Sequence, residues 1–197
     1  MSRRDRILKR GLDVALSALL LALTAPVVAA AAVAARLDTG ASGLFRQPRV
    51  GRNGRIFRVV KIRTMRRENG ATVTVRGDAR ITRLGGWLRR WKIDELPQLW
   101  NVLCGDMSLV GPRPDMPGFL DGLEGEDRVL LRLRPGITGP ATLKYRDEED
   151  LLAGNSDPER YNRQVIWPDK VRLNREYLNN YSLRGDLRCL WRTVAGG

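Results

Sequence analysis

The chain has 197 residues, enough to bury one substantial core but too few for two ordinary domains joined by a linker. It carries 35 Lys and Arg against 22 Asp and Glu, which favours polyanionic partners such as nucleic acid, anionic lipid headgroups or nucleotide phosphates. The sequence contains no histidine, which excludes the usual neutral-pH general base and leaves carboxylates as the candidates for acid-base or nucleophilic chemistry.

The first predicted element is an uncharged run from 14 to 35, about as long as a bilayer-spanning helix and longer than a typical signal-peptide core. Basic residues flank it on both sides, so the positive-inside rule places both flanks in the cytoplasm. Pro26 falls in its middle and favours a kink. We therefore predict a re-entrant helix-break-helix over residues 1–38, although hydropathy alone favours a single-pass anchor with a proline kink.

Residues 39–197 are predicted to form one catalytic domain. The β-like run from Ile56 to Ile62 follows a Gly- and Arg-rich region and indicates a hairpin or the edge of a small sheet. The polar stretch 63–80 is typical of a loop, with Thr72 to Val75 as a candidate short strand. A short helix is expected from Ile81 to Trp91.

A further helix is predicted to begin at Asp94, a good N-cap, and to end at Gly105, with an apolar stripe that includes Leu99 and Trp100. Two segments rich in Gly and Pro, at 108–118 and 134–140, are predicted to be ordered, turn-rich loops.

The C-terminal third shows helical apolar spacing at 171–178 and 183–191 within a basic background, which is typical of amphipathic helices at a membrane surface. Cys104 and Cys189 lack the spacing of a metal site or disulfide framework and are predicted to be reduced core residues. The expected fold class is α+β, mainly helical: a re-entrant membrane helix joined to a small cytosolic catalytic domain with a short β element and interfacial amphipathic helices.

The pair Asp94 and Glu95 is a candidate for chemistry on phosphorus. Free amides and the dipole at a helix start favour negative charge, so this place could hold a carboxylate, a phosphate and a bridging divalent cation. Such a pair is usually only a cap, but here a cluster of cations could clamp a pyrophosphate beside it. The cations are Lys61, Arg63, Arg80, Arg83 and Arg113.

Five blocks, in order along the chain, carry a family resemblance. They are KRGLDVALS (9–17), FRQPRVG (45–51), VKIRTM (60–65), ITRLGGWLRRWKIDELPQLWNVLCGDMSLVGPRP (81–114) and RPGITG (134–139). From Lys9 to about Asp186 the chain resembles the bacterial sugar transferases, also known as monotopic polyprenol-phosphate phosphoglycosyl transferases, in their minimal catalytic form.

The resemblance implies a two-step transfer. Asp94 attacks the sugar-bearing phosphate of a UDP-sugar and expels UMP, which leaves a covalent aspartyl-phosphosugar. Polyprenyl phosphate, in bacteria undecaprenyl phosphate, then takes the sugar phosphate to give a polyprenyl-diphosphate-sugar. This would be the first membrane step of surface glycan, O-antigen or exopolysaccharide synthesis. The implied cofactor is Mg²⁺, held by Asp94 and Glu95, with Glu95 assisting in metal or proton handling.

Mapped onto this sequence, the family motifs imply a polar shell around the substrate phosphates. Its members are Lys61, Arg63, Arg80, Gln98, Asn101, Asp106, Arg113 and Thr138. The resemblance also implies a monotopic protein of the bacterial inner membrane with Pro26 at the helix break and the catalytic domain on the cytoplasmic face. Many members carry Ser before that proline, whereas this chain has Ala25 preceded by Thr24.

One alternative remains open, a basic membrane-tethered protein that binds anionic lipid or nucleic acid without catalysis. It explains the charge and the apolar run but not the ordered blocks, and under the transferase interpretation no nucleic-acid partner is expected. Neither the identity of the sugar nor a homo-oligomeric state can be read from the residues.

Overall fold

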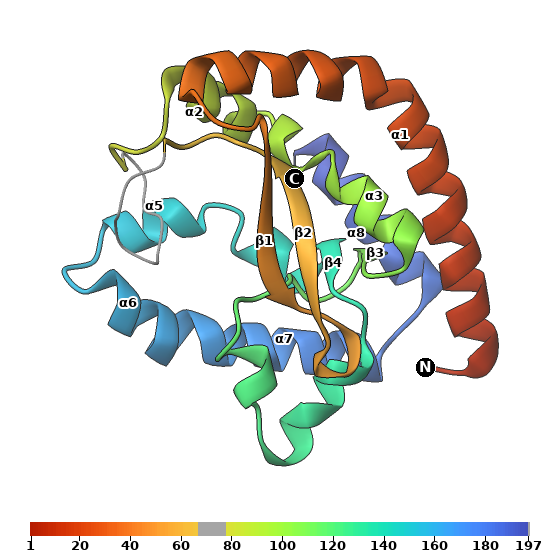
Figure 1. Ribbon diagram of the computed structural model, residues 1–197. Helices are drawn as coiled ribbons and strands as arrows, with labels where there is room; N and C mark the ends of the chain where they lie inside the picture. Colours follow the sequence, from red (N-terminus) through yellow and green to blue (C-terminus); the bar gives the residue numbers. More distant parts are fainter. Residues whose placement is uncertain (67–77, 197) are drawn as a thin grey trace.

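The computed structural model describes residues 1–66 and 78–196. It is an α+β structure, mainly helical, with two separate two-stranded sheets surrounded by helices (Figure 1), as the predicted fold class requires. The predicted strand at Thr72 to Val75 lies outside the described residues. The α-helices and strands are α1 (Arg3–Thr39), β1 (Leu44–Val50), β2 (Ile56–Ile62), α2 (Arg83–Arg90), α3 (Gln98–Cys104), β3 (Ser108–Val110), β4 (Gly136–Thr138), α4 (Pro140–Lys144), α5 (Glu148–Ala153), α6 (Pro158–Tyr161), α7 (Trp167–Asn179) and α8 (Leu183–Ala195). The remaining turns are η1 (Arg52–Gly54), η2 (Ile93–Glu95), η3 (Leu120–Gly122), η4 (Gly125–Arg132) and η5 (Asn162–Ile166).

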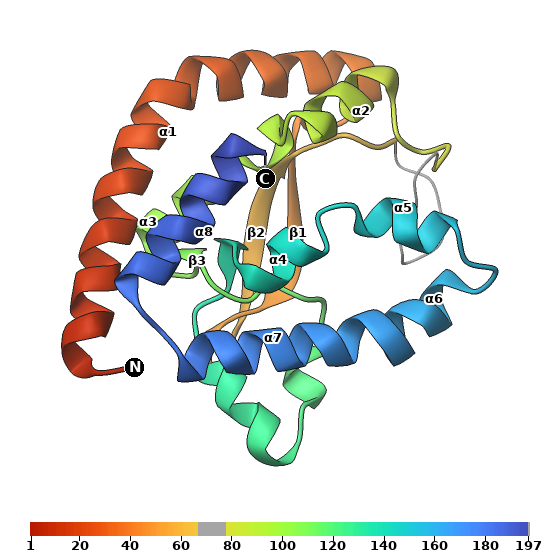
Figure 2. The ribbon, with the colours of Figure 1, turned by 180° about the vertical axis from the view of Figure 1, so that it is seen from behind.

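Helix α1 is a single 37-residue helix that bends sharply along its course and follows two sides of the molecule (Figures 1 and 2). A capping box at Ser2 begins it, and Gly40, in the left-handed region, ends it. Pro26 lies inside it, and the Thr24 hydroxyl donates to the Leu20 carbonyl at 2.7 Å, a bond that often accompanies helix bending. The predicted helix-break-helix is therefore a bend within a continuous helix.

Both limbs of α1 dock on the same folded unit. On the first limb, the Arg10 guanidinium donates to the carbonyl oxygens of Val102 and Leu103 at 2.6 and 2.9 Å. On the second limb, Ala35 packs in a buried cluster with residues of β2 and α2. Between the docked ends the apolar side chains are exposed, Leu23 by 67%. The helix is long and apolar enough to cross a membrane, and only 11% of its most apolar stretch is buried.

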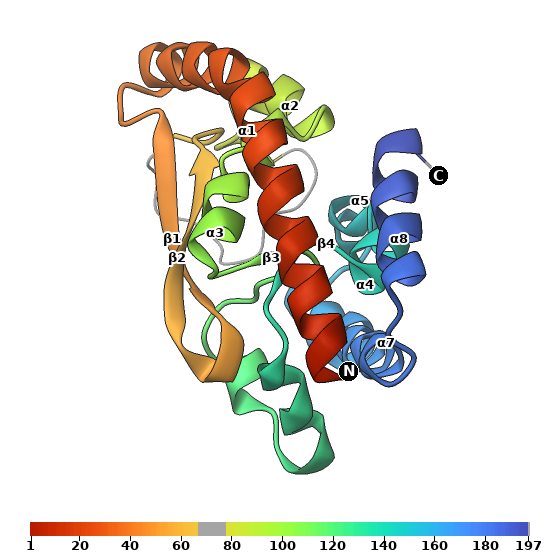
Figure 3. The same ribbon diagram turned by 90° about the vertical axis from the view of Figure 1, so that its right-hand side faces the viewer.

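The part of the structure that follows α1 is arranged in layers, which are seen edge-on in Figure 3. The β1–β2 hairpin forms one layer, α3 lies next to it, and helices α4, α5, α7 and α8 lie on the opposite side. The main core surrounds α3 and includes Val59, Val102 and Met107. The hairpin, the helix predicted at 81–91 and the two C-terminal helices are confirmed.

One prediction about an individual side chain is wrong. Cys104 is exposed rather than part of the core, and Trp100, which belongs to the predicted apolar stripe of the same helix, is 57% exposed. The reason is that α3 buries only the stripe containing Leu99 and Val102 against β2 and β3, which leaves the opposite side of this short helix uncovered. Cys189 is partly buried, and both cysteines are free thiols.

The two segments predicted as loops, 108–118 and 134–140, contain the parallel strands β3 and β4. Their backbones cross closely where the Gly111 amide donates to the Thr138 carbonyl at 2.8 Å and the Gly136 amide donates to the Pro112 carbonyl at 2.7 Å. A Cβ on Gly111 would lie 2.5 Å from the Arg134 carbonyl oxygen, and one on Gly136 would lie 2.1 Å from the Gly111 nitrogen. Glycine is required there because two main chains meet without room for a side chain.

Adjacent glycines in α2 provide a matched test of this packing. A Cβ on Gly85 would lie 2.1 Å from the Thr64 carbonyl oxygen, whereas one on Gly86 has only a methyl carbon of Ile81 at 4.0 Å. We expect Gly85→Ala to lower the free energy of unfolding by about 1–3 kcal/mol through overpacking. Gly86→Ala should raise it by about 0.5–1 kcal/mol through helix propensity. Thermal unfolding of the two variants in one detergent measures both, and equal effects would contradict the close contact of α2 with Thr64.

Candidate active site

The Asp94–Glu95 pair lies in η2, one turn before α3. Lys92 adopts a left-handed conformation at φ 56°, which a regular helix cannot contain, so the chain makes a separate 3-10 turn before α3 begins at Gln98. The predicted N-cap role of Asp94 is therefore wrong, and α3 has no side-chain cap. Asp94 is instead buried at 7% exposure, and among the described residues its Oδ1 has no hydrogen-bond partner.

Glu95 is held by two cations from distant segments. Its Oε1 accepts from the Lys61 ammonium on β2 at 3.1 Å and from the Arg113 guanidinium, in the loop after β3, at 3.0 Å. The Glu95 side chain is 11% exposed, Lys61 is 21% exposed and Arg113 is 37% exposed. The shared carboxylate thus fixes two cations beside Asp94 while leaving part of Arg113 open to solvent.

The pKa values of the two neighbouring carboxyl groups are shifted in opposite directions. Burial, reinforced by the negative charge of Glu95, raises the pKa of Asp94 to about 6. Burial alone would also raise the pKa of Glu95, but the charges of Arg113 and Lys61 outweigh it and hold that pKa well below its usual range. At neutral pH Glu95 is a firmly held anion, whereas Asp94 is an ionised carboxylate whose surroundings solvate it poorly.

Gln98 completes the centre. It follows Asp94 by one turn, is 2% exposed, and its amide nitrogen Nε2 has no partner among the described residues. Buried polar atoms without partners are rare in folded proteins, so an unpaired acceptor and an unpaired donor in successive turns indicate a place where a ligand binds. Of the sequence-predicted shell, Lys61, Gln98 and Arg113 share this centre.

The other members of the predicted shell lie elsewhere or have other contacts. The Asn101 side chain bonds the backbone of β2. Its Oδ1 accepts from the Val60 amide at 3.0 Å, and its Nδ2 donates to the Arg58 carbonyl at 2.9 Å. The Thr138 hydroxyl contacts that of Thr193 at 2.7 Å, and Asp106 is exposed beyond the far end of α3.

Two of the predicted cations, Arg63 and Arg80, contact other residues of the protein. Arg63 donates to the Ser42 carbonyl at 2.7 Å and lies over the Phe45 ring. Arg80 forms an ion pair with Asp78 at 2.6 Å. Contact of either cation with a substrate phosphate stays a prediction.

Two arginines that lie within the motif blocks but were not among the predicted site residues support the centre. Arg89 on α2 donates to the Thr64 hydroxyl at 3.0 Å and pairs with Glu149 at 2.9 Å, and its charge opposes the rise in the pKa of Asp94. Arg49 on β1 donates to the Pro114 carbonyl at 3.2 Å, which anchors the loop that carries Arg113.

A second carboxyl group with a raised pKa lies in the same loop. Burial raises the pKa of Asp115 to about 6, opposed by the charges of Lys170 and Arg49. Lys170 is itself buried in α7 and pairs with Glu148 at 2.7 Å. Asp115 directly follows the Pro-Arg-Pro sequence and could have been selected from it, whereas Lys170 and Glu148 lie in segments without a recognisable motif.

The centre is suited to a divalent cation that is shared with a substrate. Among the residues that the structure describes, no group of three or more His, Cys, Asp and Glu side chains is placed to hold a metal ion alone. Mg²⁺ usually binds through one or two carboxylates together with substrate phosphates, and the unpaired Oδ1 of Asp94 is a suitable ligand. The engaged Oε1 of Glu95 is less available for this role.

Comparison with known proteins gives a consistent result. A model of the family described as bacterial sugar transferase matches residues 4–196. The chain is 43% identical over 192 residues to the UDP-glucose:undecaprenyl-phosphate glucose-1-phosphate transferase of Caulobacter vibrioides, covering 94% of this chain and 68% of that protein. It is 36% identical over 207 residues to a protein of the same name from Escherichia coli (strain K12), covering 100% of this chain but 41% of that protein.

A relative of similar length is the exopolysaccharide production protein PSS of Rhizobium leguminosarum, 37% identical over 200 residues that cover 96% of this chain and 94% of that protein. Several other curated relatives are longer, and the chain spans less than half of their length.

The opposite pKa shifts predict opposite stability changes for the two amide variants. The Asp94 carboxyl titrates near 3.8 when unfolded and near 6 when folded, so its stabilising contribution is present below pH 3.8 and is lost as the pH rises through 6. Asp94→Asn should therefore raise the free energy of unfolding at pH 7, by at most about 3 kcal/mol. Glu95→Gln should lower it, because Lys61 and Arg113 lose a charged partner.

Denaturant unfolding of both variants at pH 7 and pH 4 checks these signs. The gain from Asp94→Asn should shrink toward pH 4, where the wild-type carboxyl is already protonated in the folded state. A loss of stability in Asp94→Asn at pH 7 would contradict the raised pKa.

Proposed function

Because the chain belongs to the bacterial sugar transferase family, we propose that it transfers a sugar 1-phosphate from a UDP-sugar to undecaprenyl phosphate, with Asp94 as the nucleophile. The names of its relatives support the reaction class. The observation that carries the assignment of roles is the contrast within the dyad. One oxygen of Glu95 is engaged by two cations, while the adjacent Asp94 is buried and its Oδ1 has no partner among the described residues.

In the first step an Asp94 carboxylate oxygen attacks the phosphorus that bears the sugar. A new carboxyl–phosphorus bond forms, the bond from that phosphorus to the bridging oxygen breaks, and UMP leaves with the electron pair. Arg113 and Lys61, already held by Glu95, bind the diphosphate oxygens and stabilise the charge that develops on them. The Gln98 amide donates to a phosphate oxygen from the adjacent turn.

In the second step an oxygen of the lipid phosphate attacks the same phosphorus. The carboxyl–phosphorus bond breaks, Asp94 returns as a free carboxylate, and the product is a polyprenyl-diphosphate-sugar. Burial favours both steps, because a poorly solvated carboxylate is a stronger nucleophile and its acyl phosphate is shielded from water. Glu95 stays ionised throughout and keeps both cations in place.

Mg²⁺ is the proposed cofactor, with Asp94 as its protein ligand and Glu95 next to it. When bound, it would neutralise charge on the donor diphosphate and so lower the electrostatic barrier to attack by an anion.

For the membrane segment we propose the re-entrant arrangement on the cytoplasmic face of the inner membrane. A straight spanning helix would separate its ends by the bilayer core of about 30 Å. Here both limbs of α1 contact one folded unit, through Arg10 at one end and Ala35 at the other. The bend, Pro26 and the basic flanks support the same arrangement.

The covalent mechanism can be tested by mass spectrometry of the full chain incubated with Mg²⁺ and a panel of UDP-sugars, without lipid acceptor. We expect one phosphosugar adduct on the wild type, no adduct on Asp94→Asn, and an adduct on Asp121→Asn, which changes an exposed aspartate in η3 outside the predicted site. The donor that gives the adduct identifies the sugar. An adduct on Asp94→Asn would refute this nucleophile, and the lack of both adduct and lipid-dependent UMP release with every donor would favour the basic binding protein.

The topology can be tested by labelling single cysteines in a chain that lacks Cys104 and Cys189. Arg4→Cys and Ser42→Cys place one thiol in the first turn of α1 and one after its end. A maleimide that does not cross membranes should label both thiols in lysed spheroplasts and neither in intact spheroplasts. Labelling of one thiol in intact spheroplasts would show a spanning helix instead.

A further inference from the structure

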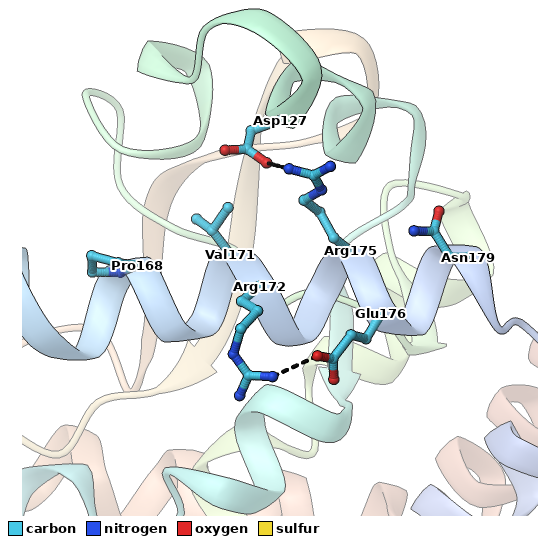
Figure 4. A pocket seen from close by; sticks show the side chains of 7 residues that line it. All are labelled: Asp127, Pro168, Val171, Arg172, Arg175, Glu176 and Asn179. Carbon is cyan, nitrogen blue, oxygen red and sulfur yellow. Dashed lines mark hydrogen bonds and ion pairs between the residues drawn. The ribbon is translucent and has the colours of Figure 1, made fainter.

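On the surface of α7, clustered cations are paired with carboxylates. A groove of about 290 Å³ lies beside α7 and η4, and Figure 4 shows Arg175 directed at Asp127 and Arg172 directed at Glu176. Both guanidinium groups are neutralised by carboxylates within the groove. No uncompensated charge is available there to bind an anion.

A second concavity lies near the N-terminal end of α1, at the same end of the molecule as the turn between β1 and β2 (Figure 3). We name it the basic cleft. The cations that line it are Arg6, Lys9, Arg10, Arg52, Arg132 and Arg134. They come from three segments far apart in the sequence, which the fold brings together, and the one carboxylate in the lining is Asp13.

Backbone carbonyls, rather than carboxylates, position the arginines of the basic cleft. Arg10 donates to the last carbonyls of α3, the Arg134 Nε donates to the Gly105 carbonyl at 2.8 Å, and the Arg52 Nε donates to the Arg132 carbonyl at 3.0 Å. Helix capping explains Arg10 and the Nε of Arg134. The terminal guanidinium nitrogens of Arg52 and Arg134 have no hydrogen-bond partner among the residues described, so helix capping gives them no role.

The positive charge of the cleft is largely uncompensated. Lys9 is paired with Asp186 at 2.6 Å, and one oxygen of Asp13 accepts from the Leu109 amide at 3.0 Å. Burial, followed by repulsion from Arg52 and Arg10, lowers the pKa of Arg134. The guanidinium groups are therefore close enough to repel one another, and fixed, unpaired guanidinium forks match the oxygens of a phosphate.

We propose that the basic cleft binds the phosphate of an anionic lipid headgroup through the terminal nitrogens of Arg52 and Arg134. The lipid source is favoured because Ile7 and Leu8, exposed by 63% and 59%, lie beside Lys9 and Arg10 on the helix that enters the membrane. The cleft contacts the last turn of α3, whereas Asp94 precedes its first turn, so this site is separate from the dyad. The proposal does not depend on the transferase mechanism.

Native mass spectrometry of the full chain in a non-ionic detergent, titrated with phosphatidylglycerol, tests the proposal. Arg52→Gln should weaken retention of the first lipid about fivefold, the effect expected for one basic residue near a charged headgroup. Arg55→Gln removes the same charge from the same turn at an exposed position outside the cleft, and it should retain the lipid as the wild type does. Arg132→Gln, a second lining variant, should weaken retention, and Asp94→Asn should not.

The wild type should retain phosphatidylcholine less than phosphatidylglycerol. Arg52→Gln should retain the two lipids equally. The proposal would be overturned if Arg52→Gln and Arg132→Gln both retained phosphatidylglycerol as the wild type does, or if Arg55→Gln lost it equally. Displacement of the lipid by equimolar inorganic phosphate would also overturn it, since the cleft would then be a site for free phosphate.

Discussion

The structure of the site depends on one carboxylate oxygen. Glu95 Oε1 accepts from Lys61 and from Arg113, and so joins the hairpin, the turn before α3 and the loop after β3 at a single point. Without that anion, two partly buried cations would repel each other and the loop would lose its contact with the rest of the centre. Burial raises the pKa of Asp94, the proposed nucleophile, and within the ion triad the negative charge of Glu95 adds to this rise while the positive charge of Lys61 opposes it.

This arrangement explains how a protein without histidine can have two adjacent acids whose pKa values differ widely. The difference arises from position, since Asp94 and Glu95 are neighbours in one turn with similar intrinsic acidity. Lys61 and Arg113 contact Glu95, whereas Asp94 is buried and its Oδ1 has no hydrogen-bond partner in the part of the chain that the structure describes. Divergent environments of paired carboxyl groups commonly separate their roles in catalysis.

Local patterns in the sequence were sufficient to predict several elements, but not β3 and β4, whose segments were predicted as loops. The hairpin, α2, α7 and α8 follow from apolar periodicity and turn residues, and the Asp-Glu pair follows from its motif. The errors arise where contacts between distant parts of the chain determine the local conformation. Asp94 was predicted as a cap because its sequence context is that of a helix start, but the left-handed Lys92 separates it from α3.

Other site assignments could not be made from the sequence because the partners are distant in the chain. Asn101 resembles a phosphate ligand until its amide is seen to bond the backbone of β2, more than forty residues earlier. The charged pair of Lys170 and Glu148 likewise exists only because α5 and α7 meet near the Arg113 loop. No local pattern reports such pairings, since they depend on how the helices pack.

The close crossing of the two glycine-containing segments limits which substitutions this chain can accept. Gly111, Gly136 and Gly139 meet where an added Cβ would lie within 2.5 Å of a backbone atom of the other segment. Neither segment can therefore accept a side chain there unless the other moves as well, and Arg113 lies two residues beyond that point. A substitution at the crossing therefore reaches the position of the Arg113 loop as well, because the two main chains can move there only together.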